Sequence, residues 1–226
     1  MKVVAMIPYW TDYHPAGDDP MQDRNLMKLG GRHPINYSLH ALNLVNAIDE
    51  IVLYCSNQDI LNSIDDQLEF EFKQRPEFLD SENITIEDII DEFLKVTDAD
   101  VIVMLHPNSP FLQYTSISEC IDKVLNSNYD SAFTAYEYKK LTWYKGSPLN
   151  YSLSEPIPQL ENLEPVVFEQ SSLYVFTRAV YLKQRKRVGN RPYLKKINHF
   201  EGHEINVKED FRIAELIVNS GMYSEY

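Results

Sequence analysis

Short, mainly apolar runs constrain the fold of this chain more than any other feature of its sequence. Residues 3–7, 50–55 and 100–105 each form such a run, and residues 131–135 and 172–177 add two more. These runs are too short for an ordinary helix and lack the apolar–polar alternation of a strand with one face in water. They are typical of strands covered on both faces, so the sequence predicts a sheet buried between two layers.

Stretches with helical spacing separate these runs. In residues 85–96, apolar residues recur every three or four positions after Thr85, a typical N-cap residue. Further helices are predicted over residues 34–47, 59–66, 117–126 and 209–219, and a short edge strand over residues 68–72. The alternation of strands and helices predicts an α/β fold with a Rossmann-like, mostly parallel sheet and helices on both faces.

The loops that follow the first three runs are the expected binding region, because ligands bind beyond the carboxyl ends of strands in such sheets. The loop after residue 7 is long and polar, and the sequence has no Lys or Arg from Val3 through Asp23. That stretch carries Asp12, Asp18 and Asp19 instead, a set of acids that would repel a phosphate unless a second metal ion intervened.

A segment over residues 137–169 breaks the alternation. It contains four prolines, and aromatic residues cluster in and beside it: Tyr136, Tyr138, Trp143, Tyr144, Tyr151 and Phe168. We expect a single domain over residues 1–226 from which this excursion protrudes. Interfaces favour Tyr and Trp, which indicates a dimer contact; the alternative is a loop folded back on its own domain.

Charge and cysteine content exclude several classes of protein. The net charge of −13 disfavours nucleic-acid binding. The one basic run, over residues 183–191, is interpreted as a solvated helix end followed by a loop, with contact to an anionic substrate as the alternative. Cys55 and Cys120 do not have zinc-site spacing, and we expect two buried thiols. The N-terminal apolar run is too short for a membrane span or signal peptide, which predicts a cytoplasmic protein.

Several segments, in order and at similar spacing, resemble the acylneuraminate cytidylyltransferase family, the CMP-sialic acid synthetases. The matching segments are residues 3–8, 24–26, 30–35, 49–52, 55–57, 75–79, 106–111, 169–174 and 204–211. For example, His106-Pro107-Asn108-Ser109-Pro110-Phe111 is similar to the family's Gln-Pro-Thr-Ser-Pro-Leu. The resemblance covers nearly the whole chain and implies a nucleotide-diphospho-sugar transferase-like fold with a dimerisation excursion.

The resemblance also implies an activity and a set of site residues. Enzymes of this family couple CTP to a nine-carbon acidic sugar with Mg²⁺ and release pyrophosphate. By position, the nucleotide-binding residues would be Pro8, Arg24, Asn25, Ser56 and Asn57. The residues expected to bind the sugar substrate are Arg75, His106, Asn108, Ser109 and Gln170. The alternative for His106 is a loop histidine that satisfies nearby carbonyl groups.

The implied metal site departs from the family pattern. Glu204 and Asn206 stand where the family has two aspartates on alternate strand positions, so that both side chains point the same way. Glu204 can ligate Mg²⁺, whereas Asn206 offers only a neutral oxygen. Arg24 and Glu204 are the predicted catalytic residues, Arg24 as the cation facing the phosphates. The alternative for Glu204 and Asn206 is a solvated strand edge before a helix.

Two functions follow from this sequence. The first is a nucleotidyltransferase that activates an acidic or unusual sugar with CTP, acting as a homodimer. The second is a non-catalytic homologue that keeps the fold to bind a sugar or a partner subunit. The retained strand-end segments favour the first function, and the loop without Lys or Arg favours the second.

Overall fold

The apolar runs form the centre of one seven-stranded sheet in the computed structural model, which describes residues 1–10, 27–221 and 223. In chain order the elements are β1 (Val3–Tyr9), α1 (Pro34–Asn43), β2 (Glu50–Cys55), η1 (Gln58–Ser63), β3 (Glu71–Gln74), η2 (Glu77–Asp80), α2 (Ile86–Phe93), β4 (Val101–Leu105), α3 (Tyr114–Asn126), β5 (Ser131–Tyr138), β6 (Trp143–Tyr144), β7 (Ser147–Pro148), η3 (Leu160–Asn162), β8 (Val166–Thr177), α4 (Arg178–Gln184), β9 (Pro192–Lys196) and α5 (Lys208–Asn219), where η denotes a 3-10 helix.

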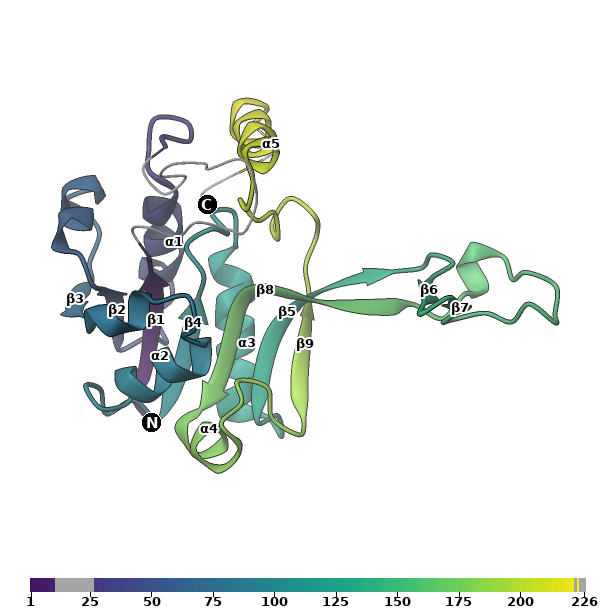
Figure 1. Cartoon of the computed structure of the whole chain (residues 1–226), viewed down its shortest axis with the longest axis horizontal. Helices are drawn as coiled ribbons and strands as arrows, with labels where there is room; N and C mark the ends of the chain where they lie inside the picture. Colours follow the sequence, from purple (N-terminus) through teal and green to yellow (C-terminus); the bar gives the residue numbers. More distant parts are fainter. Residues whose placement is uncertain (11–26, 222, 224–226) are drawn as a thin grey trace.

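The strand order is β3-β2-β1-β4-β8-β5-β9, as Figure 1 shows. Strands β3, β2, β1 and β4 are parallel to one another, and β5 is parallel to β9. Strand β8 runs antiparallel to both of its neighbours, β4 and β5. The prediction of a mostly parallel α/β sheet is therefore confirmed.

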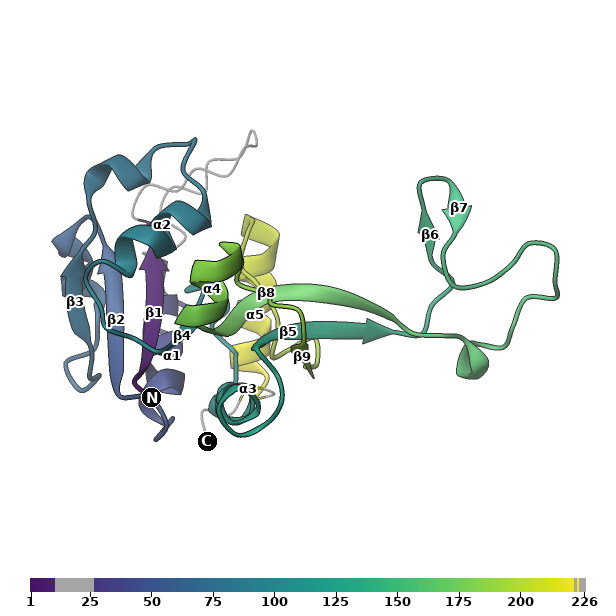
Figure 2. The same ribbon diagram turned by 90° about the horizontal axis from the view of Figure 1, so that it is seen from below.

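Helices cover both faces of the sheet (Figure 2). Alternate residues of β1 belong to different cores: Val3 and Ala5 pack with residues of α1 and α3, whereas Val4 and Met6 pack with residues of α2 and α4. Both faces are apolar for this reason, which explains the continuous runs in the sequence. The two cysteines are buried free thiols, as predicted.

The excursion is a long arm that leaves the sheet (Figure 1). Strands β5 and β8 pair from Ser131 opposite Phe176 out to Tyr138 opposite Val166, with a register shift after Phe133. The two strands stay paired past Ala135, the last residue of β5 that pairs with β9, and so continue into the arm. Along the arm β6 and β7 form a small hairpin, in which Gly146 adopts the positive φ that a tight turn requires.

Several predictions of element bounds or type were wrong, and the side chain of Asn43 explains two of them. The helix predicted over residues 34–47 ends at Asn43, whose amide donates to the carbonyls of Leu39 and Glu69 and accepts from the Glu69 N–H. These bonds hold residue 69 outside the sheet, so the edge strand starts at Glu71 instead of residue 68. The helix predicted over residues 59–66 is the 3-10 helix η1.

Helix α4 and strand β9 were not predicted, because both carry little apolar signal. Helix α4 has seven residues and buries only Tyr181. Strand β9 begins with Pro192 and ends in two lysines, and Lys195 lies 2.6 Å from Glu119. The basic run at residues 183–191 is, as interpreted, the end of a helix followed by a loop.

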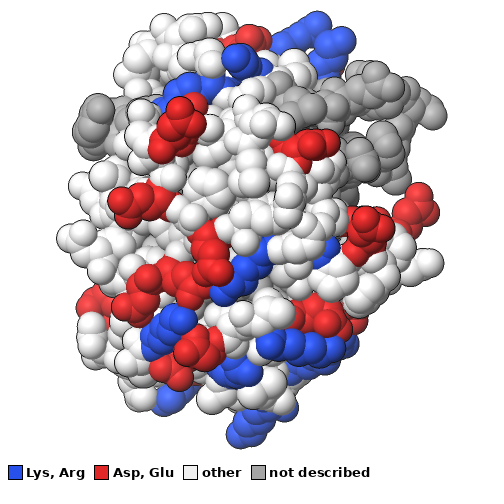
Figure 3. All heavy atoms as spheres, turned by 90° about the vertical axis from the view of Figure 1, so that its left-hand side faces the viewer, with Lys and Arg blue, Asp and Glu red and all other residues white. Residues whose placement is uncertain are grey.

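The edge of the sheet opposite β9, at β3, carries both acidic and basic side chains. Lys73 lies 2.7 Å from Glu50 and 3.4 Å from Glu71, and Lys2 lies 2.9 Å from Glu50. Figure 3 shows the molecule from this side, with acidic and basic side chains interspersed over the surface. Within the described residues, no helix has both the length and the apolar character needed to cross a membrane.

Thr85 is the N-cap of α2, and its removal tests the predicted helix start. Its hydroxyl accepts from the Asp88 N–H, and the Asp88 carboxylate accepts from the Thr85 N–H at 2.9 Å. We expect Thr85→Ala to lower the free energy of unfolding by ~1 kcal/mol in urea titrations. Thr115→Ala, an exposed threonine inside α3, is the control. Equal effects of the two substitutions would contradict the capping role.

Candidate functional site

Most of the site residues predicted from the sequence lie where parallel strands end. Pro8 is buried near the end of β1, opposite Tyr54 of β2. Ser56 and Asn57 follow β2, and the Asn57 side chain accepts from the Asp59 N–H at 2.8 Å to cap η1. The region beyond the carboxyl ends of the strands is therefore the candidate site. Arg24, Asn25, Asp12, Asp18 and Asp19 lie outside the described residues.

Arg75 follows β3 and is a fully buried cation at this edge. Its side chain is 0% exposed, its N–H donates to the Cys55 carbonyl, and its guanidinium pairs with Asp80. The guanidinium carbon also lies 4.7 Å from the centre of the Trp10 ring. Its Nε and Nη1 have no hydrogen-bond partner among the described residues. A buried donor without a partner costs about 1–3 kcal/mol, which makes Arg75 a candidate for contact with a ligand.

His106 directly follows β4, and its N–H donates to the Ser172 carbonyl. Burial, with a smaller contribution from the charge of Arg187, lowers the pKa of His106 to about 4. Arg187 is held in place over the Tyr174 ring, with its guanidinium carbon 4.2 Å from the ring centre. His106 is therefore neutral at pH 7, with one nitrogen able to donate a hydrogen bond and one able to accept.

A hydrogen-bonded network joins the predicted metal residues to the two neighbouring segments. The amide of Gln170 on β8 donates to Oε1 of Glu204 at 2.8 Å, and the Ser171 hydroxyl donates to the same oxygen at 2.7 Å. Asn206 donates to Oε2 of Glu204 at 3.2 Å and accepts from Asn108 at 2.9 Å. The structure thus brings together five side chains from three segments that lie far apart in the sequence.

The backbone around Glu204 differs from the prediction. Residues 203–206 form an irregular segment, not a strand, because their backbone bonds go elsewhere. The Ile205 N–H donates to the Asn108 carbonyl, and the Asp210 carboxylate accepts from the N–H groups of Asn206 and Val207. Asp210 caps α5 in this way. Glu204 and Asn206 are nevertheless adjacent through their side chains.

Glycine at position 202 lets this segment approach the sheet. A Cβ there would lie 2.5 Å from the Tyr136 hydroxyl oxygen and 2.7 Å from Cδ1 of Ile197, closer than any real contact. The Gly202 carbonyl accepts from the Tyr136 hydroxyl and from the Gln170 amide. Segment 202–206 is therefore fixed to both strands at the base of the arm.

Sequence reasoning missed several contributors to the site. Ser171 donates to Glu204, Trp10 covers Arg75, and Asp80 pairs with Arg75. None of these residues stands in a recognisable motif, so nothing in the sequence identified them. Ser109, which was predicted, is completely buried, and its hydroxyl has no partner in the described part of the chain.

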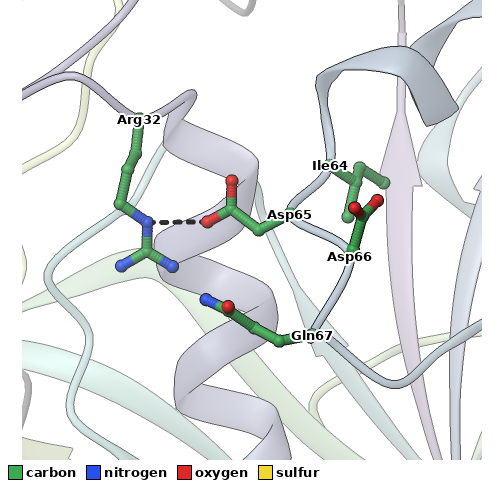
Figure 4. Close-up of a pocket in the computed structure, with 5 residues that line it drawn as sticks. All are labelled: Arg32, Ile64, Asp65, Asp66 and Gln67. Atoms are coloured by element: carbon green, nitrogen blue, oxygen red, sulfur yellow. Dashed lines mark hydrogen bonds and ion pairs between the residues drawn. The ribbon is translucent and has the colours of Figure 1, made fainter.

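A recess of about 600 Å³ lies beside α1. Arg32, Ile64, Asp65, Asp66 and Gln67 line it (Figure 4). Nε of Arg32 donates to Asp65 at 2.8 Å. Two carboxylates line this recess with one guanidinium, so its charge does not favour a phosphate. We therefore place the candidate site at the strand ends and not here.

The low pKa of His106 predicts a pH dependence of stability. Because its pKa of about 4 in the folded protein lies below the ordinary value of 6.5, the unfolded chain binds more protons between these values. The free energy of unfolding should therefore fall as the pH falls from about 6.5 to about 4. His106→Gln lacks this contribution, so denaturant titrations should give it a shallower pH profile. Parallel profiles for the two proteins would show that His106 titrates normally.

Comparisons with known proteins were made for the whole chain. A family model described as Cytidylyltransferase matches residues 21–217. The chain is similar to the structure of CMP:2-keto-3-deoxy-manno-octonic acid synthetase complexed with CTP, with 13% identity, a TM-score of 0.70, and coverage of 98% of this chain and 100% of that chain.

It is also similar to 4-diphosphocytidyl-2C-methyl-D-erythritol synthase from Anaerococcus prevotii, with 16% identity, a TM-score of 0.63 and coverage of 96% of each chain. No curated protein matches. Identities this low show a shared fold. The family model spans most of the sequence, and the chain therefore belongs to the cytidylyltransferase family.

Proposed function

We propose that this protein is a magnesium-dependent cytidylyltransferase that couples CTP to an acidic sugar and releases pyrophosphate. The observation that carries the proposal is the Glu204 carboxylate, held beside Asn206 and Asn108 at the strand ends of a cytidylyltransferase fold. Both similar structures are named for enzymes of cytidine nucleotides, and one is complexed with CTP. The acidic sugar rests on the resemblance to acylneuraminate cytidylyltransferases.

The donor atoms near Glu204 suit Mg²⁺. This ion prefers oxygen ligands and is usually bound by one or two carboxylates, substrate phosphates and water. Glu204 supplies a carboxylate, and Asn206 would supply an amide oxygen after its amide rotates. No group of three His, Cys, Asp or Glu side chains suited to a metal occurs within residues 1–10, 27–221 and 223. Phosphate oxygens and water would therefore complete the coordination.

The chain's own residues would act by binding and orientation. A sugar hydroxyl would attack the α-phosphorus of CTP in line and lose its proton to water; the new oxygen–phosphorus bond forms as the bond to pyrophosphate breaks, without a covalent protein intermediate. Bound Mg²⁺ would neutralise phosphate charge. Arg75 would donate its unused N–H groups to the substrates. Neutral His106 would exchange hydrogen bonds with the sugar, and Arg24 would face the phosphates.

A non-catalytic homologue is the second candidate function. The amide at Asn206 stands where the family has a second carboxylate, and it donates to Glu204 instead of adding negative charge. The sequence between Val3 and Asp23 also lacks cations for the phosphates. A protein of this kind would bind a sugar or a partner subunit and would bind CTP weakly or not at all.

Calorimetric titration with CTP, with and without Mg²⁺, separates the two functions. We expect micromolar binding that depends on Mg²⁺, and we expect Glu204→Ala to abolish the Mg²⁺ dependence while the fold stays intact. Glu209→Ala removes an exposed carboxylate of α5 and is the matched control. Sugar binding without any effect of CTP would support the non-catalytic homologue. Unchanged Mg²⁺ dependence in Glu204→Ala would overturn the proposed metal site.

We further propose that the protein is a homodimer formed through the arm. Exposed apolar side chains are concentrated on the arm: Leu141, Trp143, Tyr144, Leu149, Leu153, Ile157, Leu160, Val167 and Phe168. Large exposed apolar patches mark interaction surfaces. A stable dimer needs about 800 Å² buried per partner, which a projecting arm can supply by packing against a second copy.

Light scattering at several protein concentrations tests the dimer. We expect twice the chain mass of 26.4 kDa, and we expect Leu153→Glu with Ile157→Glu to shift the equilibrium toward the monomer. These two side chains are 70% and 64% exposed. Leu182→Glu, at a 65% exposed position of α4 outside the arm, should leave the mass unchanged. A mass near 26.4 kDa at every concentration would exclude the dimer.

A further inference from the structure

The orientation of the Gln170 amide is fixed by its surroundings. The side chain is only 4% exposed. Its Oε1 accepts from the Ser172 N–H at 3.0 Å and from the Thr134 hydroxyl at 2.9 Å. A backbone N–H can only donate, so the oxygen of the amide must face Ser172 and the NH₂ group must face the opposite way.

The NH₂ group of Gln170 is used entirely inside the protein. It lies 2.9 Å from the Gly202 carbonyl oxygen, 2.8 Å from Oε1 of Glu204 and 2.5 Å from the Ser172 hydroxyl. The three acceptors outnumber the two hydrogens of the NH₂ group. Gln170 therefore keeps no donor for a sugar, and its contact with Glu204 is the one that points toward the site.

The two oxygens of Glu204 have different surroundings as a result. Oε1 accepts from Gln170 and from Ser171, at 2.8 Å and 2.7 Å. Within the described part of the chain, Oε2 accepts only from the Asn206 amide, at the longer distance of 3.2 Å. An oxygen with two short hydrogen bonds has little capacity left for a cation, whereas Oε2 retains most of its lone-pair capacity.

We infer that Gln170 is a positioning residue that holds Oε1 of Glu204, so that Oε2 is the oxygen presented to a divalent cation. This inference rests on the proposed function, because it assigns the cation to Glu204. It replaces the direct sugar contact expected of Gln170 from the sequence. The physical reason is orientation: a carboxylate held through one oxygen cannot rotate away, and hydrogen bonds to metal ligands of this kind typically change metal affinity 10–100-fold.

The test compares CTP binding with and without Mn²⁺ by calorimetry. We expect Gln170→Met, which keeps the length of the side chain and removes its hydrogen bonds, to weaken binding of the Mn²⁺–CTP complex about 10–100-fold. Binding of CTP without metal should stay unchanged. A purely structural role would weaken both. Gln113→Met makes the same chemical change where the amide donates to the Phe111 carbonyl, and it should alter neither affinity.

Ser171→Ala provides a second variant if Gln170→Met does not fold. It removes the exposed donor to the same oxygen of Glu204, so a smaller, Mn²⁺-specific loss is expected. Equal losses with and without Mn²⁺, or no loss in either variant, would overturn the positioning role while leaving the proposed function in place. A wild-type protein whose CTP affinity does not respond to Mn²⁺ would instead overturn the proposed metal site, and this inference with it.

Discussion

Burial of the sheet on both faces is the constraint on which the rest of the molecule depends. Successive residues of β1 and β4 enter different cores, one beneath α1 and α3 and one beneath α2 and α4. Because helices cover both faces, a polar ligand can reach the strands only at their ends. Most of the described candidate site residues therefore lie just after β2, β3 and β4 and in the segment before α5, where side chains need not be apolar; Gln170 and Ser171 are polar residues of β8 that face this region.

The same burial explains which parts of the fold could be predicted. Strands packed on both faces have an unmistakable composition, so β2 and β4 were placed within one residue of their observed bounds. The outer part of β8 could not be identified, because residues 166–169 are partly or fully exposed and have no core to pack against. That part is a strand because its backbone pairs with β5, and pairing of this kind leaves little trace in a sequence.

For the candidate site, the sequence identified several residues but not their surroundings. The resemblance pointed to Glu204, Asn206 and Arg75, and both the resemblance and the end of a buried strand pointed to His106. The environment of each side chain was not predictable. Gln170 lies 34 positions before Glu204, and no local pattern relates them; only the packing of Gly202 against the sheet brings them into contact. Glu204 and Asn206 are neighbours, as predicted, but the segment that carries them is not a strand.

The two outer strands of the sheet bear on how this protein associates with itself. Exposed strand edges are templates for pairing with another chain, and proteins suppress such pairing with short strands, charged side chains and proline. Strand β3 has four residues and the ion pairs of Lys73, and β9 begins with Pro192 and ends in two lysines. Both edges thus resist strand addition and fibrillar aggregation. The dimer proposed above uses the apolar side chains of the arm and leaves both of these edges outside the interface.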